Sequence, residues 1–130
     1  MKFKELLKKI FYLVADFNPF LYRPEYKISG HKYEIHKRDN DIWPSYPHIH
    51  FLEGDLKLDI YTGDIYRIQT RKKINCVSNK EMIKFWNDKK NLKIIMDARN
   101  NKPVNAGDLK EIPFKWMNDD SKEWIKNYDK

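Results

Sequence analysis

The first apolar residues of the chain recur at helical spacing. Large hydrophobic side chains return every three or four positions, and lysines occupy most of the positions between them. This pattern predicts an amphipathic helix that packs on a core, with a basic membrane-surface helix as the alternative. The helix is expected to end near Asn18, because the residue before Pro19 is pushed out of the α region. The apolar stripe consists of Phe3, Leu6, Leu7, Ile10, Phe11, Val14 and Phe17.

Alternation of apolar and polar residues then predicts an antiparallel sheet. Residues 31–37 read as one strand, with Tyr33 and Ile35 on the same side. A proline-rich aromatic loop follows, and three more strands come after it. These strands are predicted over residues 47–51, 56–61 and 65–69, with turns at 52–55 and 62–64.

The turn lengths decide which side chains share a face of this sheet. An odd number of residues in the second turn produces a clean apolar face. A two-residue turn at Thr62-Gly63 is rejected, because it would place Leu58 opposite Arg67. The apolar face then holds Ile49, Phe51, Leu56, Leu58, Ile60, Tyr66 and Ile68. The polar face holds His48, His50, Lys57, Asp59, Tyr61, Ile65, Arg67 and Gln69.

Helical signals return after the sheet. Ser78 and Glu81 form a capping box, which predicts a helix start. Residues 91–99 read as a second helix or a buried strand, and helix is favoured; the tail from Asp108 onward contains a further short helical pattern. The sequence therefore predicts one α+β domain over residues 1–130. Its N-terminal helix packs on an antiparallel sheet of three to five strands, with one or two helices after Ser78.

Charge adds a second feature, because it is unevenly distributed. The formal net charge is +7. Residues 67–102 hold eleven basic and three acidic side chains, whereas residues 31–66 hold four basic and seven acidic ones. Such a basic block is typical of a protein that binds a polyanion, most often nucleic acid, less often an anionic membrane or an acidic protein. The alternative is that lysine serves only to keep the protein soluble.

Cysteine usage and hydropathy indicate the compartment. Cys76 is the one cysteine in the chain, so an intramolecular disulfide cannot form, which fits a reducing environment. The apolar stretch from Ile10 to Ala15 is short, and no A-x-A cleavage site follows it. No segment approaches the roughly 18 apolar residues of a membrane span. A cytoplasmic protein without a membrane partner is predicted.

Candidate chemistry lies on the predicted polar face, where two histidines stand one residue apart. In the predicted register, Asp59 lies opposite one of them and Arg67 lies opposite Asp59. A carboxylate sets the tautomer of a neighbouring imidazole, and cations stabilise charge on a phosphate. Two histidines on one face suit metal-free RNA cleavage, in which one accepts a proton and the other donates one. The expected catalytic residues are His48, His50, Asp59 and Arg67, and the expected nucleic-acid-binding residues are Lys57, Arg71, Lys72 and Lys73.

Two other interpretations of the histidines stay open. The first is an ordinary solvated sheet face. The second is a metal site in which Asp59 or Glu53 adds a third ligand. The cupin pattern needs a differently placed glutamate, and the histidine-triad pattern needs a histidine where Leu52 stands, so no metal or cofactor is expected. His31 and His36 fall on opposite faces of a strand, so they cannot both join the site.

Part of the chain resembles a family of small uncharacterised bacterial proteins. That family has a P-P-H-[FH]-H-V stretch, a D-I-x-T-G-E hairpin and a following helix with tryptophan. The match covers Pro47 to about Arg99 and departs at Tyr46, where the family has a first proline. The matching residues are Pro47-His48-Ile49-His50-Phe51, Leu58-Asp59-Ile60, Thr62-Gly63 and Trp86. Members often sit beside toxin–antitoxin-like genes, and the resemblance implies a similar setting.

Two functional hypotheses follow. The leading one is a small, basic, RNA-directed protein of toxin type, a metal-independent ribonuclease that uses the histidine pair and has a cognate antitoxin partner. The rival is a non-catalytic binding protein, an inhibitor or immunity factor of a mobile element. Its basic block would dock on an acidic protein or on nucleic acid.

Overall fold

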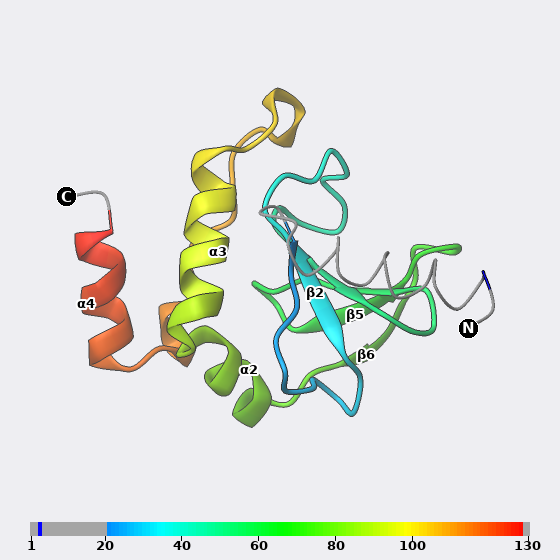
Figure 1. Cartoon of the computed structure of the whole chain (residues 1–130), viewed down its shortest axis with the longest axis horizontal. Coiled ribbons are helices and arrows are strands. Elements are labelled where there is room, and N and C mark those ends of the chain that lie inside the picture. The colour runs from blue at the N-terminus through cyan, green and yellow to red at the C-terminus, as the bar shows by residue number, and fades with distance from the viewer. Residues whose placement is uncertain (1–2, 4–20, 129–130) are drawn as a thin grey trace.

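Within residues 21–128, a six-stranded sheet precedes three α-helices. The computed structural model describes residue 3 and residues 21–128 (Figure 1). Every strand pairs antiparallel with the next strand along the chain, so the sheet order is β1-β2-β3-β4-β5-β6. The strands are β1 (Leu21–Tyr22), β2 (Tyr33–His36), β3 (Ile49–Phe51), β4 (Leu56–Leu58), β5 (Asp64–Arg67) and β6 (Lys73–Cys76). Apart from Phe3, the predicted N-terminal helix lies outside the described residues.

Three α-helices follow the sheet and gather beside it (Figure 1). They are α2 (Asn79–Trp86), α3 (Lys89–Asn100) and α4 (Asp119–Asn127), with single 3₁₀ turns at Val104–Ala106 and Phe114–Trp116. None of the helices in the described residues is long and apolar enough to cross a bilayer.

The predicted fold class is therefore wrong. A helix on three to five strands was expected, with one or two helices after Ser78, whereas residues 21–128 contain six strands followed by three α-helices. The two strands that the prediction missed lie at the sheet edges. β1 has only two residues, and all four residues of β6 are exposed. Neither shows the alternation of burial by which a strand is recognised in a sequence.

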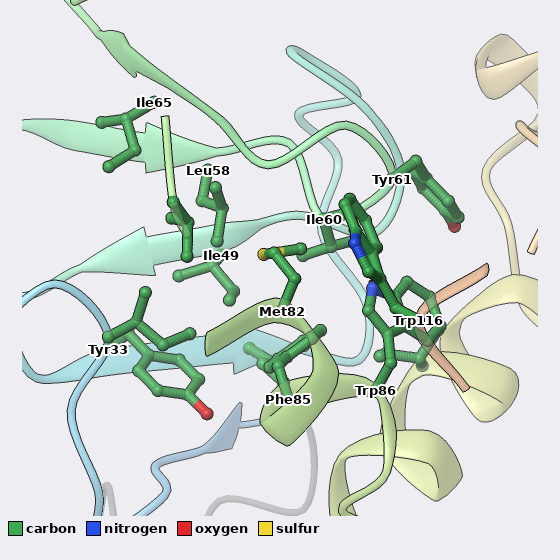
Figure 2. Close-up of a cluster of buried hydrophobic side chains, with 14 of the residues drawn as sticks. Tyr33, Ile49, Leu58, Ile60, Tyr61, Ile65, Met82, Phe85, Trp86 and Trp116 are labelled. Atoms are coloured by element: carbon green, nitrogen blue, oxygen red, sulfur yellow. The ribbon is translucent and has the colours of Figure 1, made fainter. Parts of the chain in front are cut away.

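The hydrophobic core lies between one face of the sheet and helix α2 (Figure 2). Met82, Phe85 and Trp86 of α2 are fully buried, and Trp86 Nε1 donates a hydrogen bond to the Ile60 carbonyl at 2.9 Å. Burial of each such side chain contributes roughly 1.5–3 kcal/mol. The sheet contributes Tyr33, Ile35, Ile49, Phe51, Leu58 and Ile65 to this cluster. Because alternate residues point to opposite faces, the histidines beside Ile49 lie on the other side of the sheet.

The register between β4 and β5 corrects the predicted turn. Leu58 pairs with Ile65 and Leu56 pairs with Arg67. The turn between them is closed by Gly63, which has a φ of 83° and donates its N–H to the Asp59 carbonyl at 2.8 Å. Ile65 therefore joins the core. The predicted turn with an odd number of residues had placed Ile65 on the polar face. Arg67 shares the face of Leu56 and points away from the histidines.

Candidate metal centre

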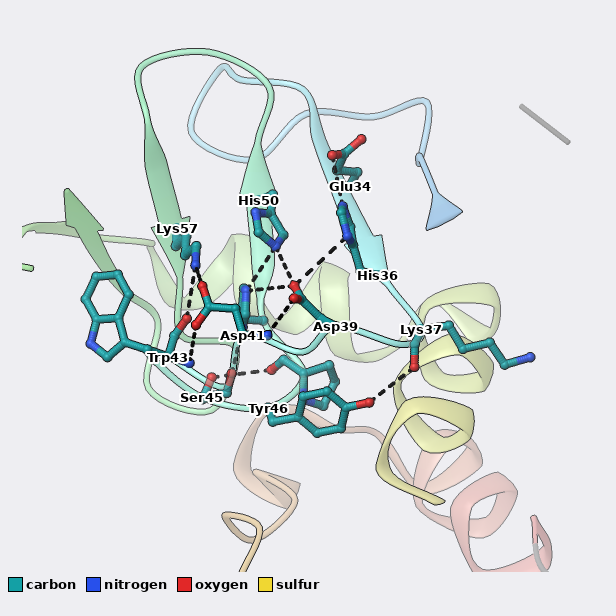
Figure 3. A network of polar contacts seen from close by, with 12 residues as sticks. Glu34, His36, Lys37, Asp39, Asp41, Trp43, Ser45, Tyr46, His50 and Lys57 are labelled. Carbon is teal, nitrogen blue, oxygen red and sulfur yellow. Dashed lines mark hydrogen bonds and ion pairs between the residues drawn. The ribbon is translucent and has the colours of Figure 1, made fainter. Parts of the chain in front are cut away.

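The loop between β2 and β3 lies over the polar face of the sheet (Figure 3). Two aspartates shape this loop. The Asp39 carboxylate accepts a hydrogen bond from the Asp41 N–H at 2.9 Å, and the Asp41 carboxylate accepts one from the Trp43 N–H at 3.0 Å. The loop also contains two cis X–Pro peptide bonds. This local geometry brings the Asp39 carboxylate against the histidines of the sheet.

Three donor atoms converge beneath the loop. The Nε2 atoms of His48 and His50 are 3.0 Å apart. Asp39 Oδ2 lies 3.3 Å from the Nε2 atom of His48 and 2.8 Å from that of His50. His36, the last residue of β2, joins the group: donor atoms of His36, Asp39 and His50 all lie within 4.8 Å of one another. Asp39 and His50 therefore have two further histidines close by, His48 and His36.

A backbone carbonyl orients His48. Its Nδ1 atom lies 2.7 Å from the Ser45 carbonyl oxygen. Because a carbonyl oxygen can only accept, Nδ1 carries the proton and donates. The other ring nitrogen, Nε2, faces Asp39 and His50. Metal-binding histidines usually have such an outer hydrogen bond on the second ring nitrogen.

A carboxylate orients His36 in the same way (Figure 3). The His36 Nε2 atom lies 3.0 Å from Glu34 Oε1, and Glu34 in turn accepts a hydrogen bond from Arg23 Nε at 2.9 Å. A proton on Nε2 leaves Nδ1 as the lone-pair atom, and Nδ1 is 4.0 Å from Asp39 Oδ2. The His36 ring also stacks on His50, with 4.4 Å between centroids. The ring is therefore held close to the group.

The protonation states suit metal ligands. Burial alone would raise the pKa of Asp39, but hydrogen bonds from His48, His50 and the Asp41 N–H outweigh it and hold the pKa well below its ordinary value. Burial lowers the pKa of His50, although its hydrogen bond with Asp39 acts in the opposite direction. At neutral pH the site therefore offers a carboxylate and a neutral imidazole, the forms that bind a metal.

The spacing of the donors matches a coordination polyhedron. Bonds of about 2.0 Å to a tetrahedral Zn²⁺ place neighbouring ligand atoms about 3.3 Å apart. The three distances among His48, His50 and Asp39 lie at or slightly below that value. The His48 side chain is fully buried, whereas 23% of His50 and 34% of His36 is exposed. An ion in this position would have protein on one side and solvent access on the other.

The structure brings together only two of the four predicted catalytic residues, His48 and His50. Asp59 is 1% exposed, and its carboxylate accepts hydrogen bonds from the Tyr61 N–H at 2.9 Å and from Lys110 Nζ at 2.5 Å. It therefore neutralises a cation of the C-terminal segment and does not orient an imidazole. Arg67 is exposed on the opposite face of the sheet.

The predicted nucleic-acid-binding residues differ in exposure and in whether an acidic residue pairs with them. Lys57 is 4% exposed and is paired with Asp41. Lys73 forms an ion pair with Asp64 at 3.1 Å. Arg71 and Lys72 are exposed. Only these last two present an accessible cation that no acidic residue in the described part of the chain neutralises.

Sequence reasoning missed Asp39 and set His36 aside. The stretch Arg38 to Asp41 reads as an ordinary turn, and only the folded loop brings Asp39 back over the sheet. His36 carried a usable signal, since it lies on the polar side of its strand, opposite Tyr33 and Ile35. His31 stays away from the site and packs edge-on against Phe51, with 6.1 Å between ring centroids.

Comparisons with known proteins identify no relative. No family model matches the chain, and neither a curated protein nor a solved structure matches it. The geometry of the site is therefore the basis for the function proposed below.

Proposed function

We propose that this protein is a metal-dependent hydrolase whose divalent transition-metal ion is held by His48, His50 and Asp39, with His36 beside the position left open for water. The observation that carries the proposal is the triangle of donor atoms, with sides of 2.8, 3.0 and 3.3 Å. Histidine and carboxylate ligands together are typical of zinc and of non-haem iron centres that do chemistry.

The solvent-exposed side of the group supports a reactive role for the ion. A structural zinc site is closed by four protein ligands, whereas a hydrolytic one keeps a position for water. A bound Zn²⁺ lowers the pKa of its water to about 7, which provides hydroxide at neutral pH. The part-exposed rings of His36 and His50 mark the side from which water and substrate would approach.

The metal-independent ribonuclease expected from the sequence stays a prediction, but the geometry favours the metal centre. An acid and a base that act on one phosphate must stand on either side of it. The Nε2 atoms of His48 and His50 are 3.0 Å apart, a hydrogen-bonding distance that leaves no room for a phosphate between them. Neither Asp59 nor Arg67 contributes to the group.

The setting expected from the sequence also stays a prediction. A toxin-type role in the cytoplasm, with a cognate antitoxin, rests on the resemblance and on the basic block. The metal centre is compatible with that role, because a hydrolase can be a toxin.

The test is titration of the metal-free full-length protein with Zn²⁺ and Co²⁺. We expect one equivalent to bind, with visible Co²⁺ absorption bands of a nitrogen and oxygen site. Asp39→Asn and His50→Ala change part-exposed residues and are expected to weaken binding at least 100-fold. His31→Ala is the matched control, because it removes a histidine outside the group. Wild-type affinity in both ligand variants would overturn the proposal, as would failure of the wild-type protein to bind either ion.

A further inference from the structure

A row of side chains crosses the polar face from the candidate metal centre toward β6. Cross-strand neighbours define it: His50 pairs with Lys57, Lys57 with Tyr66, and Tyr66 with Lys73. Neighbouring strands are about 4.8 Å apart, so Tyr66 lies roughly 10 Å from His50. The row therefore connects the centre to the basic hairpin between β5 and β6.

Aromatic rings and a guanidinium gather at the far end of this row. We call this group of Trp43, Tyr66 and Arg71 the Trp43 platform. The Trp43 and Tyr66 rings meet edge to face, with 5.5 Å between centroids. The Arg71 guanidinium lies 4.9 Å from the centroid of the Trp43 ring. Lys57 holds the loop in place, since its ammonium donates to the Trp43 carbonyl at 3.3 Å and pairs with Asp41. Lys57 is buried, so it supports the platform and does not reach solvent.

Arg71 is the most unusual residue of the platform. Its φ is 58°, in the left-handed region that non-glycine residues seldom occupy. Its backbone N–H donates to the Arg67 carbonyl at 2.9 Å, which closes the hairpin. Arg23 by contrast pairs with Glu34, whereas no carboxylate within residues 21–128 pairs with the Arg71 guanidinium. A positioned guanidinium with unused N–H donors suits a phosphate.

We propose that Trp43, Tyr66 and Arg71 form a binding surface for single-stranded nucleic acid, and that a phosphodiester of the bound strand is the substrate of the metal centre. This inference rests on the proposed hydrolase function. Arg71 contacts phosphates, and the exposed parts of the two rings stack with unpaired bases. A duplex hides its base faces, which is why the surface suits a single strand.

The reaction is a hydrolysis without electron transfer. An ion held by His48, His50 and Asp39 would supply a hydroxide nucleophile at neutral pH. Hydrolysis would form a bond from a water oxygen to phosphorus and break the bond from phosphorus to the leaving sugar oxygen. The proton lost by that water would go to solvent, and the leaving oxygen would take up a proton from solvent.

The experiment measures binding of a fluorescein-labelled oligoribonucleotide of about a dozen nucleotides by fluorescence anisotropy, in excess chelator. Chelator removes the metal, so the result is independent of the metal centre. We expect Arg71→Ala and Trp43→Ala to weaken binding about tenfold. Arg67→Ala is the matched control, because it removes an equal charge from the opposite face, and it is expected to leave binding within about twofold.

Several results would overturn the proposed surface. One is an equal loss of RNA affinity in Arg67→Ala and Arg71→Ala. The others are tighter binding of a duplex than of the single strand, and binding of polyglutamate without binding of RNA. A salt dependence that falls by about 0.7 in log–log slope in Arg71→Ala supports a direct phosphate contact. If the protein binds RNA but no Zn²⁺, the proposed hydrolase function is overturned and the proposed binding surface is retained.

Discussion

Tyr61 shows how one buried hydroxyl joins separate segments of the chain. Its O–H donates to the Tyr46 carbonyl at 2.9 Å and accepts from Arg99 Nη1 at 2.9 Å. The side chain thereby ties the histidine-bearing loop to helix α3. Burial raises the pKa of Tyr61 to about 12, although the nearby Arg99 guanidinium acts in the opposite direction. The neutral hydroxyl is thus the form that the folded protein needs.

Alkaline pH is therefore expected to destabilise the protein through Tyr61. An unfolded tyrosine loses its proton near pH 10, and the folded one holds it to about pH 12, so this stabilisation is complete below pH 10 and is lost as pH rises toward 12. At pH 11 the loss is about 1 kcal/mol. Urea unfolding at pH 9 and 11 measures it, and Tyr61→Phe should show a smaller decline. An equal decline in both proteins would refute the role of Tyr61.

At the same scale, the sequence predicted part of the candidate site. His48 and His50 could be placed together because H-x-H on a strand directs both rings to one face. Asp39 could not be placed, because its position depends on how the loop folds back over the sheet. Asp59 follows β4 directly, and nothing local in the sequence indicates that Lys110, 51 residues later, takes its carboxylate.

At the scale of elements, each described α-helix begins with a side-chain cap. Ser78 accepts from the Glu81 N–H, Asp88 from the N–H groups of Lys90 and Asn91, and Asn118 from that of Ser121. The predicted helix start at Ser78 is confirmed. The second half of the predicted capping box differs, since the Glu81 carboxylate accepts from the Ser29 N–H at 2.6 Å. Glu81 therefore links α2 to the turn before β2.

Loss of the Asp88 cap is expected to lower stability. Asp88 accepts two backbone hydrogen bonds, at 2.9 and 3.1 Å, at the start of α3. Asp88→Ala leaves both N–H groups without this partner, which costs about 1 kcal/mol in the free energy of unfolding. Asp108→Ala, an exposed change in a loop, is the control and should stay within about 0.5 kcal/mol. Equal effects in the two variants would contradict the capping role.

The sequence predicted helices better than sheet registers for a physical reason. Helices α2 and α3 are built from local signals, namely caps and apolar positions with helical spacing. A sheet register depends on contacts between segments, so the choice of a single turn decides the face of a whole strand. Placing Ile65 on the wrong face moved Arg67 to the wrong face as well.

At the scale of the whole molecule, the sheet divides two environments. One face packs on α2 and forms the core, and the other carries the candidate metal centre and the Trp43 platform. Each strand of the sheet pairs with the strand that follows it in the sequence. The centre is therefore built on the same strands that hold the core together, and an ion bound there is coupled to global stability.

Metal binding is accordingly expected to stabilise the fold. At a free Zn²⁺ concentration of about 100 times the dissociation constant, linkage adds up to about 2.7 kcal/mol. Thermal unfolding followed by circular dichroism should show a higher midpoint with Zn²⁺ than with chelator. Asp39→Asn should remove the difference, whereas Arg71→Ala should retain it, since Arg71 lies outside the ligand group. A midpoint that Zn²⁺ raises equally in Asp39→Asn would count against this coupling.

The proposed ligands and His36 all come from one uninterrupted stretch, His36 to His50, which spans a single hairpin. Because this loop is short, an ion that joined its two ends would restrict only one local segment of the unfolded chain. The stabilisation that the ion provides would therefore come from its contacts in the native state and little from restricting the unfolded chain.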